Sequence, residues 1–297
     1  MTAHMEQDLA AADPTARPAF FYILGDVVYY YGQASEYYPQ FYEPYTHYDA
    51  PILAIPGNHD GDLIDTSVPS LAAFVENFCS TTPHISTEAG DSARDTMTQP
   101  NVYWTLDTPF ATFIGLYTNV PEGGWMDTTQ IAWLQSELTS APQNKALIVN
   151  MHHPIYSADT FHSGSAYMGT ILDQAIQASG RVPDAVFAGH VHNYQRFTRT
   201  INGRNVPYIV TGSGGYWHLH KVIQVQGQPI QTPYPVPSSD VTLESYSDDH
   251  HGYLLMTVDR TTLTARYFAV PTQRDPANAP SQQIDAFTLN LATHQLQ

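Results

Sequence analysis

The chain has 297 residues and a net charge of −17, because 28 acidic residues stand against 11 Lys and Arg. This balance excludes a basic nucleic-acid-binding surface, since nucleic acids are bound through clustered positive charge. No apolar run reaches the roughly 18 residues that a membrane-spanning helix needs, and a single cysteine excludes an internal disulfide. The sequence therefore predicts one domain, 1–297, with neither nucleic acid nor membrane as a partner.

Helical and strand patterns alternate along the first two thirds of the chain. The predicted order is a helix at 2–12, strands at 19–24 and 52–55, a helix from Asp127, a strand at 146–149, a helix at 170–178 and a strand at 185–188. Asp127 and Gln130 are spaced as a capping box, and Ile131, Leu134 and Leu138 continue as an apolar stripe. Strands that alternate with helices are typical of a layered α/β core.

The last third of the chain has a different pattern, with β-like segments and no clear helix. Segments 194–201 and 205–211 are joined through Asn202-Gly203, which is a strong hairpin signal. Segments 253–258 and 263–270 form a second β pair, and the polar, Pro-rich stretch 224–250 predicts a long loop. We therefore divide the domain into a motif-bearing core at about 19–215 and a β-rich part at about 216–297.

A polar patch directly follows each of the four predicted strands of the core. Short apolar runs of this kind are typical of strands that are covered on both faces. The side chains in these patches that could bind metal are Asp26, Asn58, His59, His152, His153, His190 and His192. Carboxylate, amide and imidazole ligands without thiolate suit zinc, iron, manganese or cobalt. We expect these patches to meet at one edge of a sheet and to form a metal site.

The motifs appear in the order GD-x-x-Y (25–29), GNH-D (57–60), H-x-P (152–154) and GHVHNY (189–194). In this order they resemble the calcineurin-like metallophosphoesterases, and the Tyr after the Asp is most similar to the purple acid phosphatase branch. The resemblance covers about 19–215 and, weakly, 253–268. It implies a four-layer α/β/β/α sandwich with two sheets facing each other.

The resemblance also implies a dinuclear metal centre. Asp26 would bridge two metal ions, with one site completed by Asn58, His152 and His190 and the other by Tyr29 and His192. The ions would be iron together with zinc, manganese or a second iron, and Tyr29 as a phenolate would give a ferric ion a visible colour. Tyr29 also lies in a Tyr-rich stretch, 29–48, so it could instead pack on the core or line a pocket mouth.

Further residues receive roles in catalysis and substrate binding from the same resemblance. His59 would donate a hydrogen bond or a proton to the phosphate, and Asp60 would orient the His59 ring. Asn58, His59 and His162 would bind the substrate phosphate, although His162 could also be an ordinary loop histidine.

The family begins with a strand that carries an Asp before the GD motif, and this chain shows no such strand. Its first residues predict the helix at 2–12 instead, and Asp8 and Asp13 are the nearest carboxylates. We therefore expect a sandwich that lacks the first strand and a first metal site that lacks one carboxylate. A truncated sequence and a genuine variant both explain this departure.

The sequence as a whole predicts a metal-dependent phosphomonoesterase of the acid-phosphatase kind, acting on a small phosphate ester. The alternatives are a phosphodiesterase or nucleotidase of the same superfamily, and a truncated, inactive, metal-poor relative with a binding role. The low charged fraction of 13% and the many Tyr, Thr, Pro and Gln residues favour a secreted or periplasmic protein.

Overall fold

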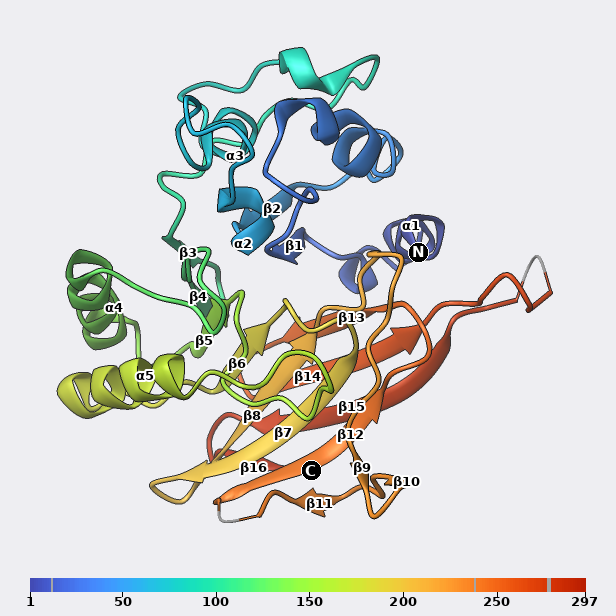
Figure 1. The fold of residues 1–297 in the computed structure, drawn as a ribbon. Helices are drawn as coiled ribbons and strands as arrows, with labels where there is room; N and C mark the ends of the chain where they lie inside the picture. Colours follow the sequence, from blue (N-terminus) through green and yellow to red (C-terminus); the bar gives the residue numbers. More distant parts are fainter. Residues whose placement is uncertain (12, 238, 277–278) are drawn as a thin grey trace.

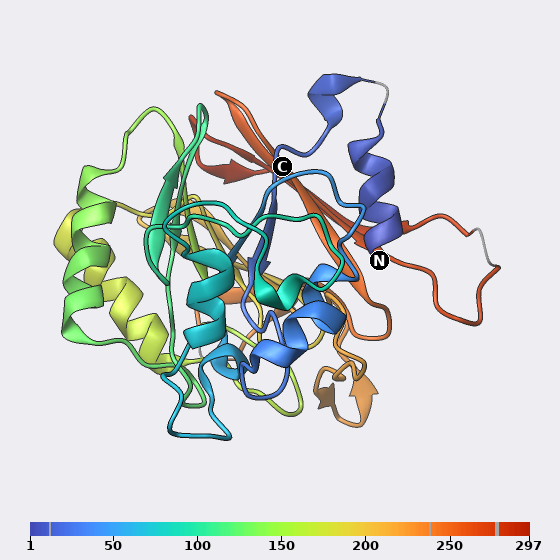
Figure 2. The ribbon, with the colours of Figure 1, turned by 90° about the horizontal axis from the view of Figure 1, so that it is seen from above.

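The computed structural model describes residues 1–11, 13–237, 239–276 and 279–297, and its helices lie on the two outer faces of a pair of sheets (Figure 1). The α-helices are α1 (Thr2–Leu9), α2 (Asn58–Gly61), α3 (Ala72–Phe78), α4 (Thr128–Ser140) and α5 (Ala166–Ser179). The 3-10 turns are η1 (Pro14–Ala16), η2 (Ala34–Glu36) and η4 (Thr87–Ala89), and η3 (Tyr38–Tyr42) is a π-helical turn. Figure 2 shows α4 and α5 together on one flank and α1 on the opposite flank. None of the described helices is long and apolar enough to cross a bilayer.

An eight-stranded sheet forms the centre of the fold, in the order β11-β12-β7-β8-β6-β5-β4-β3. Its strands are β3 (Trp104–Asp107), β4 (Ala111–Gly115), β5 (Ala146–Met151), β6 (Ala185–Ala188), β7 (Tyr194–Ile201), β8 (Arg204–Thr211), β11 (Tyr234–Pro235) and β12 (Val241–Ser247). Strands β4, β5, β6 and β8 run parallel. β5 and β6 are buried along their whole length, which explains their uninterrupted apolar sequence.

The second sheet layer is made of two separate pieces. Its strands are β1 (Phe21–Leu24), paired with β2 (Ile52–Ile55), and the antiparallel set β13 (Gly252–Val258), β14 (Thr262–Ala269), β15 (Gln282–Asn290) and β16 (Gln295–Leu296). Between the layers, Phe113 and Phe187 of the large sheet share one apolar core with Leu263 and Phe287. A small hairpin, β9 (Gln224–Val225) and β10 (Gln228–Pro229), lies apart from both layers.

The two helices that cover the large sheet, α4 and α5, each begin at a residue whose side chain caps the helix N-terminus. The Asp127 carboxylate accepts a hydrogen bond from the Gln130 N–H at 2.7 Å, so the predicted start of α4 is confirmed. Ser165 caps α5 in the same way, and this cap starts the helix four residues before the predicted 170. Leu134 and Leu138 of α4 then pack against the outer face of the sheet.

The predicted long loop at 224–250 is wrong, because this stretch contains β9, β10, β11 and β12. β12 pairs antiparallel with β7 and so extends the large sheet. Val241 and Leu243 of β12 are buried and alternate with polar residues that stay partly exposed. Because polar residues also surround this strand in the sequence, the stretch resembled a loop. The N-terminal helix is also shorter than predicted, since α1 ends at Leu9.

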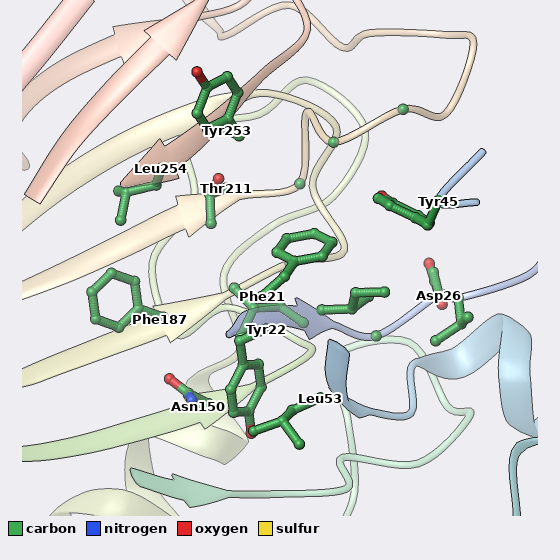
Figure 3. Close-up of a pocket in the computed structure, with 18 of the residues that line it drawn as sticks. Phe21, Tyr22, Asp26, Tyr45, Leu53, Asn150, Phe187, Thr211, Tyr253 and Leu254 are labelled. Carbon is green, nitrogen blue, oxygen red and sulfur yellow. The ribbon is translucent and has the colours of Figure 1, made fainter. Parts of the chain in front are cut away.

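A cavity of about 1640 Å³ separates the two pieces of the second layer (Figure 3). Among the described residues, β1 pairs only with β2 and β13 only with β14. Leu24 of β1 and Leu254 of β13 nevertheless enter the core between the sheets, while Phe21 and Tyr253 enter the core under the outer helices. β1 and β13 are therefore parts of one interrupted layer. That a first strand is missing from this layer stays a prediction.

We predict that the two edges of β1 differ in amide exchange. The Phe21 N–H donates to the Pro51 carbonyl at 2.9 Å, so the N–H groups of Phe21 and Ile23 face β2 and those of Tyr22 and Leu24 face the cavity. NMR-detected hydrogen exchange should show Tyr22 and Leu24 exchanging faster than Ile23. Equal protection of both sets would mean that the cavity edge is closed in solution.

Candidate metal centre

The four predicted patches meet at one edge of the two sheets. β1 and β2 run parallel, as do β5 and β6, so that the carboxyl ends of each pair point the same way. Asp26 follows β1, Asn58 opens α2 after β2, and His152 and His190 follow β5 and β6. Side chains from residues that are 164 positions apart are thereby brought together, because parallel strands deliver their following loops to a common edge.

Tight backbone packing makes this convergence possible. Gly25 and Gly57 face each other, and a Cβ at Gly57 would overlap the Asp26 carboxylate and the His152 ring. Asp26 and His190 adopt left-handed φ angles of 53° and 62°, which are rare for residues other than glycine. Strained residues of this kind cluster at functional sites.

One group of ligand atoms surrounds the Asn58 amide oxygen. His152 Nε2 lies 2.9 Å from Asn58 Oδ1 and 3.3 Å from Asp26 Oδ2, and His190 Nδ1 lies 3.0 Å from Asn58 Oδ1. His152 Nδ1 donates to the Leu24 carbonyl at 2.7 Å, so the Nε2 lone pair faces Asp26 and Asn58. The ligand atoms of Asp26, His152 and His190 all lie within 4.8 Å of one another. These donors fit a metal ion.

A second group lies beside the same oxygen of this carboxylate, Asp26 Oδ2. The Tyr29 hydroxyl is 3.1 Å from Asp26 Oδ2 and 3.3 Å from His192 Nε2. His192 Nδ1 donates to the His218 carbonyl at 3.1 Å, and this contact turns its Nε2 lone pair toward Tyr29. Both groups of oxygen and nitrogen donors therefore share Asp26 Oδ2.

The charges of these groups suit metal binding, which requires ionised carboxylates and neutral imidazoles. Burial works to raise the pKa of Asp26, but the neighbouring His152 and His59 outweigh it and hold this pKa well below its usual value. Burial, together with the charge of His220, lowers the pKa of His192 to about 4. Burial also lowers the pKa of His190. Asp26, His190 and His192 thus have the protonation states that metal binding requires. Burial works to lower the pKa of His152, but the Asp26 carboxylate outweighs it and raises this pKa, so a cation competes with a proton at His152.

His59 and Asp60 lie at the site, but the predicted contact between them is absent from it. His59 Nδ1 donates to the Tyr30 carbonyl at 2.8 Å, which leaves Nε2 of this ring directed elsewhere. The Asp60 carboxylate accepts the backbone N–H groups of Gly57, Val27 and Val28 at 2.8–3.2 Å. The prediction that Asp60 orients the His59 ring is wrong, because Asp60 is buried and joins the two loops that follow β1 and β2.

The structure brings His162 to the site together with a carboxylate that the sequence did not indicate. The His162 ring lies 4.3 Å from the His190 ring. Glu122 Oε1 lies 3.0 Å from His162 Nδ1 and 3.4 Å from His190 Nε2, on the side of His190 that faces away from Asn58. Carboxylates often orient histidine ligands in this way. Glu122 lies in a loop 68 positions from His190, so no sequence spacing could have found it.

Two more histidines pack against the candidate ligands: His153 against His190, and His220 against His192. His153 is buried, with Nδ1 2.8 Å from the Thr118 hydroxyl and its ring 4.4 Å from the His190 ring. The His220 ring lies 4.6 Å from the His192 ring, and its Nδ1 is 3.2 Å from Asp159 Oδ2. Asp159 also accepts the His162 N–H at 2.9 Å, which joins the loop of His162 to the His192 side.

The model of the family described as calcineurin-like phosphoesterase matches residues 4–194, which is more than half of the chain. The chain belongs to the calcineurin-like phosphoesterase family. The resemblance that the motifs indicated is thereby confirmed. Members of this family depend on bound metal ions, in agreement with the donor groups around Asp26.

Within this family the chain is similar to purple acid phosphatases. Purple acid phosphatase 21 of Arabidopsis thaliana is 32% identical over 127 residues, which are 41% of this chain and 28% of that protein. Purple acid phosphatase 15 of the same plant is 25% identical over 218 residues, 71% of this chain and 38% of that protein. The chain thus matches well under half the length of these relatives.

A solved structure supports the fold. Purple acid phosphatase PPD1 from yellow lupin (Lupinus luteus) seeds superposes with a TM-score of 0.66 over 97% of this chain and 48% of that chain, at 22% identity. The likeness at this identity concerns the fold, and it confirms the predicted α/β sandwich of the metallophosphoesterase type.

We predict that replacing Asp60 by Ala lowers stability. The substitution leaves three buried N–H groups without an acceptor, which should cost about 3 kcal/mol of the free energy of unfolding. Urea denaturation would measure the change, with the exposed Asp65→Ala as a control. Unchanged stability together with lost activity would instead restore the catalytic role predicted from the sequence.

Proposed function

We propose that this chain hydrolyses phosphoric monoesters with the help of two metal ions, which Asp26 and the two groups of donors beside it would hold. The observation that carries the proposal is the position of this carboxylate, whose Oδ2 lies beside both His152 and Tyr29. His152 belongs to the group with Asn58 and His190, and Tyr29 to the group with His192. Family membership supports the reaction class.

The residues of the chain have distinct tasks in this reaction. Metal ions supply Lewis-acid activation of water and of the phosphoryl oxygens when they are bound. Asn58 lies beside His152 and His190, and the His162 ring lies beside the His190 ring. From these positions Asn58 and His162 hold the phosphoryl group of the substrate. His59 keeps Nδ1 on the Tyr30 carbonyl, so its other nitrogen, when protonated, gives a proton to the leaving oxygen.

The metal pair that suits these ligands is iron with zinc, manganese or a second iron. Burial and the Asp26 carboxylate raise the pKa of Tyr29 well above its usual value, so Tyr29 becomes a phenolate only beside a strongly charged cation. A ferric ion has this charge. The Tyr29 side carries one carboxylate, Asp26, and thus fewer acidic ligands than the family pattern implies.

We predict that Asp26→Asn and His190→Ala each lower kcat/KM for phosphate monoesters at least about 100-fold, because each removes a ligand or its charge. Steady-state kinetics on a small phosphate monoester would measure the effect. His47→Ala, at an exposed position, serves as the control and should keep full activity. Activity retained in both site variants would contradict the proposal that Asp26 and His190 hold the metal ions.

We further predict that the purified chain contains about two metal ions and absorbs visible light through a ferric Tyr29 phenolate. Elemental analysis and absorption spectroscopy would measure both, and Tyr29→Phe should remove the colour but leave the ion bound beside Asn58. One ion or none in the wild type would support the metal-poor alternative, in which the chain only binds its ligand.

A further inference from the structure

Two strand edges in the second sheet layer have no partner strand, and both border the cavity of about 1640 Å³. On β1, the N–H groups of Tyr22 and Leu24 face the cavity, because those of Phe21 and Ile23 face β2. No other described strand pairs with this edge. An unpaired edge of this kind is a template for a further strand.

The second free edge belongs to β13 and lies on the side away from β14. The Asp259 N–H, at the end of β13, donates to the Thr262 carbonyl at 3.0 Å and so faces β14. Successive N–H groups along a strand alternate in direction, so those of Leu254, Met256 and Val258 point away from β14. Within the part of the chain that the structure describes, these three groups have no hydrogen-bond partner.

Residues of both strands line the same cavity, among them Phe21 and Leu254 (Figure 3). Its two remaining walls are the large sheet and the core under the outer helices. Both walls are apolar, with Phe113 and Phe187 on the sheet side and Tyr45 on the helix side. A strand placed between β1 and β13 would therefore have apolar surroundings on both of its faces.

The charge around the cavity is acidic. The acidic residues that line it are Asp8, Asp26, Glu36 and Asp107, and none of its described lining residues is Lys or Arg. The whole chain adds a net charge of −17. A ligand with positive charge at its ends is therefore favoured over an acidic one.

We propose that an extended segment of another polypeptide inserts between β1 and β13 and completes this layer. The segment is apolar over about six residues, which is the usual length of a strand, and basic residues flank it. Only a peptide backbone offers N–H and C=O groups to both free edges at once. A lipid chain would fill the apolar walls but leave the edge groups unpaired, which is costly. A strand that is covered on both faces is apolar throughout.

The first test uses a fluorescein-labelled peptide in which alternating Val and Ile residues lie between two pairs of Lys. Fluorescence anisotropy should show saturable binding to the wild-type chain. The same peptide with every second amide N-methylated loses the donors of one edge and should bind at least about tenfold more weakly. A version with Glu in place of Lys should also bind more weakly. The probes carry no phosphate, so the result does not depend on the proposed function.

The second test compares Met256→Pro with Met256→Ala. Proline removes the N–H that faces the cavity and leaves the hydrogen bonds between β13 and β14 in place, as is usual for proline on an edge strand. Peptide affinity should be at least about tenfold lower in Met256→Pro than in Met256→Ala. Thermal unfolding followed by circular dichroism checks that both variants are folded.

Hydrogen exchange in the wild type locates the bound peptide even if Met256→Pro fails to fold. Bound peptide should slow the exchange of the Tyr22 and Leu24 amides at least about tenfold and leave Ile23 nearly unchanged. Absence of saturable binding, or binding without this protection, would overturn the proposal.

Two further outcomes would identify a different occupant and so refute the proposal. Equal affinity for the N-methylated peptide would mean that the cavity takes apolar ligands without strand pairing. A dimer in analytical ultracentrifugation, with Tyr22 and Leu24 already protected in the absence of peptide, would mean that a second copy of this chain covers the edge.

Discussion

The site depends on a single buried carboxylate and on the backbone packing that admits it. Asp26 Oδ1 accepts the His59 N–H at 3.0 Å, while Oδ2 lies beside Tyr29 and His152. A buried carboxylate is costly unless it is paired or hydrogen-bonded. Gly25 and Gly57 leave the space in which these partners reach it. Without this close approach, residues in the loops that follow β2 and β5 could not contact the Asp26 carboxylate, which follows β1.

The donor groups come from two different sheets, and this arrangement has a mechanical consequence. Asp26 and Asn58 follow β1 and β2, whereas His152 and His190 follow strands of the large sheet. Cations bound between them would tie the two layers together at one edge. Metal binding and the stability of this edge are therefore linked. The linkage matters here because the layer that carries β1 is interrupted by the large cavity.

The Tyr-rich stretch that follows β1 serves two purposes that its composition could not separate. Tyr42 and Tyr48 are buried in the core under the outer helices, with 0% and 2% of their surface accessible. The Tyr29 hydroxyl lies beside Asp26 and His192, and Tyr30 is exposed to solvent. The stretch thus contains tyrosines that pack in the core and one tyrosine beside the candidate ligands, and metal binding by Tyr29 stays a prediction.

The sequence by itself determined four buried strands, the α4 cap and the polar patches after β1, β2, β5 and β6. These features are local, because a short apolar run followed by a turn defines a buried strand end. Hence Asp26, Asn58, His152, His190 and His192 could be named as candidate ligands before their distances were known.

Only the tertiary structure decided which side chains surround those ligands. Glu122, Asp159 and Tyr216 come from loops with no distinctive spacing, and Asp60 uses its carboxylate on the backbone rather than on His59. β12 was hidden because its polar face is partly exposed at the side of the large sheet. Such contacts join residues far apart in the chain, so they follow from the packing of the layers and leave no periodic pattern in the sequence.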